Sequence, residues 1–502
     1  MLVDSLAFQI EKSGCLDAFW GKLDRGEDAA LAVASSARPF MTAARFAHEP
    51  QPTLVVVAGE EAAVAFARNV AAFVGEDRVL RFPERRDQPF APKHPDARVV
   101  AQRMEAAHSL ASGRSVVVVA SARSLVRLLP PAEANAQAPL SFHEGDDLAD
   151  GVMPGVEEFG DLARALEERG YANTGELDGP GTFAVHGGVI DVYPGNLVYP
   201  VRIDFFGDEV DEIRRIVPST GQTVATLKSV EVYPVAEFSC TRIALARARK
   251  AIERQAQTNP ALRDILEKLD GGLRFDGSDV LLPYLYDRTV TLGDYAGDGV
   301  LSVLVEPRSL VDDAAHYLEE VQGRAKGTGF STKGLFAEPA ELDFGGRQRA
   351  TYVSIMRVGT VVDEELPVKR VDVAGAPDKL FGKLRNLLDG GYTCVFSAPN
   401  YRAREDMKLA MVDHGLPIQE RLELTGASDE EVRDASVLVG EESGRPVNKG
   451  AEKRRLRRSC VNIVDAVVPL GMIIPKAKLA RYPTRRGPNP PLDLVAWSIS
   501  PR

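Results

Sequence analysis

Three short runs of aliphatic residues, each next to a helical pattern, constrain the fold of this chain more than any other feature. The runs are TLVVVAG, RVLRF and SVVVVAS, at residues 53–59, 78–82 and 115–121. A strand that is buried on both faces gives a continuous apolar run, and such strands are typical of parallel sheets covered by helices. Helical patterns follow at residues 60–74 and 97–112. This alternation predicts an α/β domain built on a parallel sheet.

A different pattern begins near residue 138. Two segments, GTFAVHGGVIDVYP at residues 181–194 and VRIDFFGDEVDEIRRI at residues 201–216, alternate apolar and polar residues. A period of two predicts antiparallel strands buried on one face, here within a small α+β insert. Helical patterns then dominate before a further α/β unit begins near residue 378. We therefore expect five segments: 1–137 and 226–350 as two parts of the first α/β domain, 138–225 as the insert, 351–480 as a smaller α/β domain, and 481–502 as a disordered tail.

The charge of the chain limits its partners. Its formal net charge is −11 at pH 7, so most of its surface should repel nucleic acid phosphates unless basic residues gather on one face. One basic run, KGAEKRRLRR, occurs at residues 449–458. A run this short is more often a solvated loop than a nucleic-acid patch, and both interpretations stay open. The composition thus argues against a protein whose main surface binds DNA.

The cysteines and histidines are too dispersed for a metal site. None of the four cysteines lies in a CxxC pair, and the seven histidines form no HExxH pattern. We therefore expect no metal, no catalytic residue and no disulfide framework, which suits a reducing cytoplasm. No apolar run reaches the length of about 18 residues that an ordinary membrane span needs, and the first residues do not resemble a signal peptide. The expected location is cytoplasmic.

Residues 181–223 resemble the UvrA-binding domain that is shared by the excinuclease subunit UvrB and bacterial transcription-repair coupling factors. The shared pattern has an aromatic residue after Gly-Thr, then Gly187, Asp191 and Pro194, and then the block at residues 202–209. The order of predicted elements over most of the chain also agrees. This resemblance implies a P-loop-like parallel-sheet domain with an inserted UvrA-binding-type α+β domain, followed by a smaller α/β domain. It also implies that UvrA is the protein partner.

The resemblance also indicates which residues would contact UvrA. Successive side chains along residues 182–193 point to opposite faces, and composition alone would make the polar face an ordinary surface. The resemblance instead implies six partner-binding residues: Tyr171, Asn173, Ala184, His186, Arg202 and Asp204. Family members carry arginines where this chain has Asn173 and His186. Neutral Asn and His offer fewer charge-assisted donors than a guanidinium, so we expect altered contacts at these two positions.

The resemblance further implies that a nucleotide site has been lost. UvrB has a P-loop near its amino terminus, and a P-loop holds phosphates and Mg²⁺ with glycine N–H groups, a lysine and a hydroxyl residue. In the matching segment at residues 29–46, Ala32, Ser35 and Ala37 stand for glycines, Arg38 for the lysine and Pro39 for the hydroxyl residue. Proline supplies neither a hydroxyl nor an N–H. We therefore expect a degenerate P-loop and no bound cofactor.

Coupling factors continue with an RNA-polymerase-binding domain and a two-lobed translocase that uses ATP and Mg²⁺, and neither is recognisable in this sequence. We therefore expect a truncated or frame-shifted coupling factor, acting as a non-catalytic UvrA-binding adaptor in transcription-coupled nucleotide excision repair. Contacts with RNA polymerase and DNA would come only through the missing domains. The alternative is a UvrB-like ATP-dependent helicase acting on damaged DNA, but the tyrosine-rich hairpin with which UvrB clamps DNA has no counterpart between residues 82 and 99. A pseudogene product without a cellular role is a third possibility.

Overall fold

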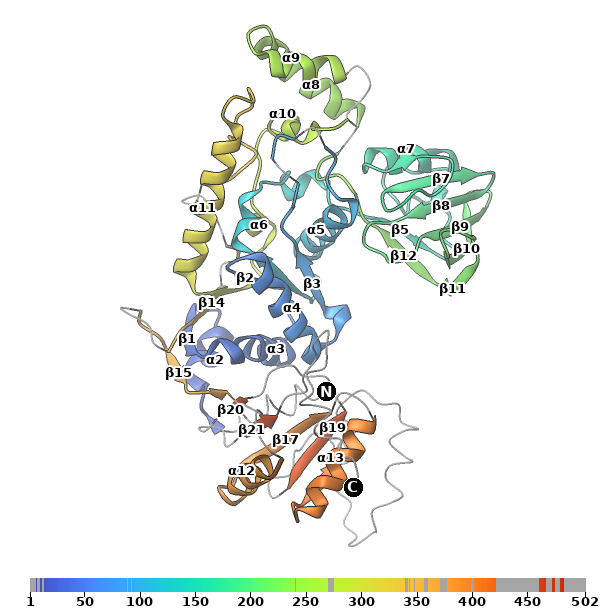
Figure 1. Cartoon of the computed structure of the whole chain (residues 1–502). Coiled ribbons are helices and arrows are strands. Elements are labelled where there is room, and N and C mark those ends of the chain that lie inside the picture. The colour runs from blue at the N-terminus through green and yellow to red at the C-terminus, as the bar shows by residue number, and fades with distance from the viewer. Residues whose placement is uncertain are drawn as a thin grey trace.

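The computed structural model of the chain describes residues 6, 10, 13–87, 89–91, 93–239, 241–269, 275–338, 342, 344–346, 348–355, 360–370, 377–398, 401–420, 460–465, 472–474 and 479–482. Figure 1 shows a central α/β body with a small sheet domain on one side. The helices α8 (Arg242–Ala256) and α9 (Pro260–Lys268) lie at one end of this body, and a second small α/β unit lies at the other.

The central body is a seven-stranded sheet in the order β15-β1-β14-β13-β2-β4-β3. All its neighbouring strands are parallel, which confirms the predicted α/β fold. The three aliphatic runs form β2 (Thr53–Val57), β3 (Val79–Phe82) and β4 (Val117–Ser121). The other strands are β1 (Ala29–Val33), β13 (Leu301–Val305), β14 (Gln348–Val353) and β15 (Glu364–Leu366).

Helices cover both faces of this sheet, which explains why its central strands β2, β4 and β13 are buried along their whole length. Leu54 and Val56 of β2 belong to one core, whereas Val55 and Val57 belong to the other. Full burial of such a side chain contributes roughly 1.5–3 kcal/mol, so both cores stabilise the sheet. One face is covered by α2 (Asp17–Asp24), α3 (Arg38–His48) and α4 (Glu60–Val74), and the other by α5 (Ala97–Ala111), α6 (Ala122–Val126) and α11 (Pro307–Ala325).

The small domain is a six-stranded sheet in the order β11-β10-β9-β8-β7-β6. Strands β7 to β11 form an antiparallel meander, as the alternating pattern predicted, and β6 adds parallel to β7. The core side of this sheet packs against α7 and the strand pair β5–β12. The elements are β5 (Leu140–His143), α7 (Leu162–Glu168), β6 (Ala172–Asn173), β7 (Thr182–His186), β8 (Val189–Tyr193), β9 (Val201–Phe206), β10 (Glu209–Ile216), β11 (Thr223–Leu227) and β12 (Ser229–Val232).

The stretch after the small domain is mainly helical, as its sequence pattern indicates. It contains α8 and α9, the short helices η7 (Ser278–Leu281) and α10 (Leu282–Leu285), and α11. Strand β13 interrupts it and returns the chain to the central sheet beside β2. Within the described ranges, no helix combines the length and the apolar character that crossing a membrane requires.

The second α/β unit has its own sheet in the order β16-β20-β21-β17-β19-β18. Its elements are β16 (Lys369–Arg370), α12 (Pro377–Asp389), β17 (Thr393–Ala398), α13 (Tyr401–Asp413), β18 (Ile418–Glu420), β19 (Val461–Asp465), β20 (Met472–Ile474) and β21 (Leu479–Tyr482). Helix α13 packs beside β17 and β19, and Met411 of α13 is buried with Cys394 of β17 and Val461 of β19.

The predicted disordered tail is wrong at its first two residues. Arg481 and Tyr482 extend β21, where they lie opposite Val395 and Phe396 of β17. The backbone of β17 supplies a parallel partner for this segment, and such pairing overrides its Pro- and Arg-rich composition. The rest of the expected tail, residues 483–502, and the basic run at residues 449–458 lie outside the described residues.

Candidate functional site

The small sheet has a polar face on the side away from its core. Side chains of Ile190, Ile203 and Ile213 lie opposite one another and are buried on the core side. Because side chains alternate along a strand, the intervening residues point the other way. We call the set His186, Arg202, Asp204, Phe206 and Arg214 the outer face.

Ion pairs fix the charged groups of the outer face. Arg202 donates from Nε and Nη2 to the two carboxylate oxygens of Asp191, each at 2.7 Å. This bidentate pair joins neighbouring strands β8 and β9, and the hydrogen bond to Asp191 raises the pKa of Arg202. Arg214 donates to Asp204 across β9 and β10, and its Nε lies 3.3 Å from Glu212. The outer face is therefore preorganised, with guanidinium groups held in place before any partner arrives.

The structure brings three of the six expected contact residues together. His186, Arg202 and Asp204 share the outer face, with Asp204 opposite Val189 and Val189 opposite His186. Asn173 is exposed, but it pairs with the buried Phe183 and so lies on the core side at the sheet edge. Its Oδ1 accepts the Gly175 N–H at 3.4 Å, as in a local turn.

The other two expected contact residues, Tyr171 and Ala184, are buried. Tyr171 has no exposed surface, and its hydroxyl donates to the Tyr233 carbonyl oxygen at 2.7 Å. Burial raises the pKa of this hydroxyl, which keeps it a neutral donor. Ala184 lies on the same side of the sheet as Arg202, opposite Asp191, but it is only 1% exposed. Neither side chain is available to a partner in this conformation. Tyr171 instead ties the segment after α7 to the segment after β12.

Phe206 is an outer-face residue that the sequence pattern left unassigned. It ends β9 at the turn into β10 and is 83% exposed. The preceding Phe205 points inward and packs edge-on against Phe142 and Phe159, with ring centroids 6.4 and 5.1 Å away. Since two successive strand residues cannot both face the core, the doublet FF itself indicates an exposed aromatic ring.

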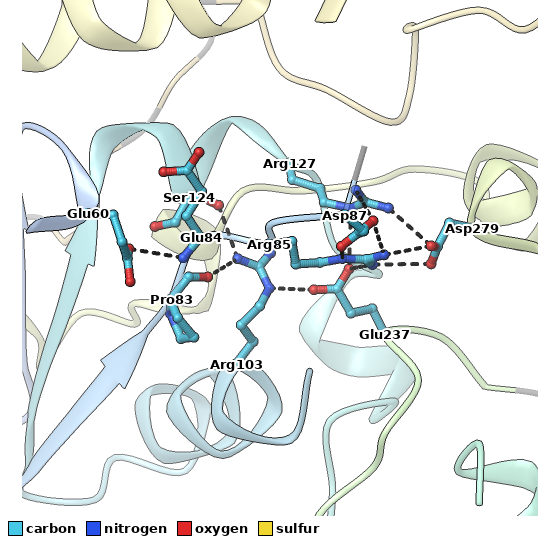
Figure 2. A network of polar contacts seen from close by, with 10 residues as sticks. All are labelled: Glu60, Pro83, Glu84, Arg85, Asp87, Arg103, Ser124, Arg127, Glu237 and Asp279. Atoms are coloured by element: carbon cyan, nitrogen blue, oxygen red, sulfur yellow. Dashed lines mark hydrogen bonds and ion pairs between the residues drawn. The ribbon is translucent and has the colours of Figure 1, made fainter. Parts of the chain in front are cut away.

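A buried ionic network anchors the small domain to the central body (Figure 2). Glu237 follows β12, at the point where the chain leaves the small domain. Its carboxylate accepts from Arg85 Nη1 at 2.8 Å and from Arg103 of α5. Asp279 accepts from Arg85 Nη2 at 2.6 Å, and Arg127 Nη2 lies 3.4 Å from the same carboxylate. Segments far apart in sequence therefore meet in one cluster.

The charges of this network balance. Arg85, Arg103 and Arg127 face the carboxylates of Asp87, Glu237 and Asp279. Burial alone would raise the pKa of Glu237, but the guanidinium groups hold it well below its usual range. Buried charges are tolerated only when they are paired in this way.

The backbone of the small domain also meets α5 closely. Gly195 lies so near this helix that a Cβ there would be 2.3 Å from the Ala97 carbonyl oxygen. Arg98 of α5 donates from Nη1 to the Leu197 carbonyl oxygen at 3.0 Å. These contacts and the ionic network set the orientation of the outer face relative to the central body.

The segment that we expected to correspond to a degenerate P-loop forms a tight turn. Ala32 lies in β1, and Ser35 and Ala37 lie in the short helix η1 (Ser35–Ala37) that precedes α3. The Ala37 N–H donates to the Ala34 carbonyl oxygen at 2.9 Å, so this donor is occupied. Pro39 lies in the first turn of α3, where it offers no N–H.

Arg38 is held by a carboxylate of the chain itself. Its side chain is buried and forms an ion pair with Glu306, which directly follows β13. Glu306 has a left-handed backbone with φ of 55°, an uncommon conformation for a residue with a side chain. Its N–H donates to the Tyr352 carbonyl oxygen at 2.8 Å, which fixes this conformation. Arg38, which the resemblance led us to expect at the position of a P-loop lysine, is thus already paired. Among the described residues, no cluster of three or more His, Cys, Asp or Glu side chains could hold a metal ion.

Comparison with known proteins places the small domain in a described family. A family model named UvrB interaction domain matches residues 157–238, which include α7, the six-stranded sheet and Glu237. The chain is 30% identical over 306 residues to the transcription-repair-coupling factor of Myxococcus xanthus, which covers 58% of this chain and 25% of that protein. It is 24% identical over 448 residues to the transcription-repair-coupling factor of Bacillus subtilis, covering 82% of this chain and 37% of that protein.

A second group of relatives matches as well. The UvrABC system protein B of Thermotoga petrophila is 29% identical over 238 residues, covering 45% of this chain and 34% of that protein. The matches to these three curated relatives thus span between a quarter and about two fifths of each relative's length. The expected resemblance is confirmed: residues 157–238 match the UvrB interaction domain model, and a longer part of the chain is similar to transcription-repair-coupling factors and to UvrABC system protein B.

Proposed function

We propose that this chain is a non-catalytic adaptor of nucleotide excision repair that binds UvrA through the outer face. The observation that carries the proposal is that the UvrB interaction domain presents Phe206 beside fixed charged groups on its open face. Protein interfaces draw much of their affinity from aromatic and arginine side chains that become buried on binding. The outer face offers both kinds of side chain without any rearrangement of its sheet.

The preorganised ion pairs favour a protein partner with complementary charge. Arg202 is held by Asp191, and its side chain is still 31% exposed. A partner carboxylate can therefore meet a guanidinium whose position is already fixed, which lowers the entropy lost on binding. Asp204 is 22% exposed and offers acceptor lone pairs next to the same site. Because positive and negative side chains alternate on neighbouring strands, the outer face would favour one orientation of a partner with the complementary charges.

The test is competition with UvrB for UvrA. The intact chain should displace labelled UvrB from UvrA in a concentration-dependent manner, because the shared interaction domain would occupy the same surface of UvrA. A variant that carries Arg202→Glu and Phe206→Ser should lose this competition while keeping its folded spectrum. Undiminished UvrB binding at a large excess of the intact chain would contradict the proposal.

Replacement of His186 by Arg is expected to tighten UvrA binding by about 1 kcal/mol, roughly fivefold in Kd. His186 is exposed on the outer face, where a guanidinium would add charge-assisted donors. Asn173→Arg is the matched comparison and should change the affinity less, because Asn173 lies on the core side at the sheet edge. Titration calorimetry with UvrA measures both effects. A larger gain from Asn173→Arg would show that the partner approaches from that edge instead.

The absence of catalysis in this chain is the second part of the proposal. Its support is the pairing of Arg38 with Glu306, the occupied Ala37 N–H and the proline at position 39. A fluorescent ATP analogue should therefore show no saturable binding at micromolar concentrations, with or without Mg²⁺. Micromolar affinity would favour the alternative, a UvrB-like ATPase.

A further inference from the structure

Helix α8 gathers basic residues within an acidic chain. It carries Arg242, Arg247, Arg249, Lys250 and Arg254 but only one acidic residue, Glu253, whereas the whole chain has a net charge of −11. All five basic residues are exposed. An acidic protein can still attract phosphates where basic residues gather locally, and helix α8 meets this condition.

Two of these basic residues, Lys250 and Arg254, lie on the side of α8 opposite its buried stripe. Ala248, Ile252 and Ala256 form its buried stripe. Lys250 and Arg254 are four residues apart, so their side chains are neighbours on the opposite side of the helix. Figure 1 shows α8 and α9 as a pair projecting beyond the central body, well separated from the second α/β unit. Within the described ranges, neither Lys250 nor Arg254 takes part in an ion pair.

An aromatic cavity of about 330 Å³ adjoins this helix. Its lining includes the rings of Tyr284, Tyr286 and Phe330 together with Arg288 and Lys333. Two contacts join it to α8: the Tyr284 hydroxyl donates to Gln255 Oε1 at 3.4 Å, and Arg247 forms an ion pair with Asp287 of the cavity wall. This volume falls in the range of small-ligand pockets, about 300–1,000 Å³.

Aromatic rings beside unpaired cations are the combination that binds single-stranded nucleic acid. Cations follow the phosphate backbone, and unpaired bases stack on aromatic rings. Lys333, at the cavity, is exposed and has no ion pair among the described residues. A duplex would offer phosphates to Lys250 and Arg254, but its paired bases could not enter the cavity. The aromatic lining therefore favours a single strand over a duplex.

We infer that α8 and the adjoining cavity form a binding site for single-stranded nucleic acid. Lys250 and Arg254 bind its phosphates, Lys333 binds a phosphate at the mouth of the cavity, and a base stacks beside Tyr284. This site lies outside the matched interaction domain at residues 157–238, so it shares no residue with the outer face. It also departs from the expectation that DNA is contacted only through domains missing from this sequence.

The test is fluorescence anisotropy of a labelled oligothymidylate with the intact chain at low and rising salt. The triple variant Lys250→Glu, Arg254→Glu and Lys333→Glu should weaken binding at least about tenfold and lower the salt slope by about 2, since each lost phosphate contact on a single strand removes about 0.7 from it. The matched control is Arg68→Glu, Arg78→Glu and Arg308→Glu, which makes the same charge change at three exposed residues. These residues lie in α4, in the turn before β3 and in α11, respectively. Equal losses in both triple variants would overturn the proposal.

A second variant separates base stacking from charge. Tyr284→Leu keeps an apolar side chain but removes the ring, and it should weaken oligothymidylate binding about fivefold or more. Binding of polyglutamate, which has charge but no bases, should be much weaker than that of oligothymidylate and should not respond to Tyr284→Leu. Equally tight binding of polyglutamate or of a blunt duplex would contradict a single-strand site. Matching circular dichroism spectra establish that each variant is folded.

Discussion

Replacing Glu237 by Gln is expected to lower the free energy of unfolding by about 3–5 kcal/mol, because it removes one partner from a buried ionic cluster. Gln keeps the shape of the side chain but not its charge. Arg85, Arg103 and Arg127 would then face two carboxylates instead of three. An unbalanced positive charge would remain where Arg103 has no exposed side chain and Arg85 is only 2% exposed.

The effect of this substitution should depend on pH. The guanidinium groups depress the pKa of Glu237 in the folded state, although burial opposes them. A carboxyl group with a depressed folded-state pKa stabilises the protein above its unfolded pKa, about 4.3 for glutamate. This contribution is lost progressively as the pH falls below that value. The difference between the parent chain and Glu237→Gln should therefore be full at pH 7 and shrink below about pH 4.

Denaturant unfolding followed by circular dichroism measures this difference. Glu158→Gln is the matched control, since Glu158 belongs to the same domain but is exposed, and surface substitutions usually change stability by less than about 0.5 kcal/mol. A loss below about 1 kcal/mol for Glu237→Gln would mean that the network does not anchor the domain.

Replacing Phe206 by Ala is expected to weaken UvrA binding by about 2 kcal/mol, or about 30-fold in Kd. The ring is 83% exposed in the free protein, so it has most of its apolar surface left to bury against a partner. For the same reason the substitution should leave the stability of the chain nearly unchanged. A loss of affinity without a loss of stability distinguishes an interface residue from a structural one.

The control for Phe206 is Ile243→Ala. Ile243 is also 83% exposed but lies on α8, outside the interaction domain. Its truncation should leave the affinity for UvrA unchanged. Surface plasmon resonance with immobilised UvrA measures both variants, with the change expected mainly in the dissociation rate. Equal effects of the two substitutions would show that general hydrophobicity, not the outer face, drives the association.

The parallel sheet and the meander were predictable because both leave periodic patterns in the sequence. The aliphatic runs became β2, β3 and β4, and the alternating segments became β7 to β10. The resemblance at residues 181–223 falls inside the matched interaction domain at residues 157–238, whereas the expected insert spanned residues 138–225. Local patterns carry this information because strand burial determines which residue types can occupy each position.

Contacts between distant residues were not predictable in this way. Arg85, Glu237 and Asp279 lie on three separate segments. The local sequence around each residue does not indicate which of the others it contacts. The burial of Tyr171 was not predictable for a related reason. Its hydroxyl donates to the carbonyl oxygen of Tyr233, which follows β12, and no pattern near position 171 reveals this contact. Side-chain facing could be derived only along regular strands, as for Phe205 and Phe206.

The most direct test of the adaptor proposal is a calorimetric titration of UvrA with the intact chain. The outer face predicts saturable binding with a micromolar or tighter Kd and a stoichiometry of one chain per UvrA protomer. The negative heat-capacity change that accompanies burial of Phe206 should be part of the signal. No detectable binding at tens of micromolar, with both proteins folded, would contradict the proposal.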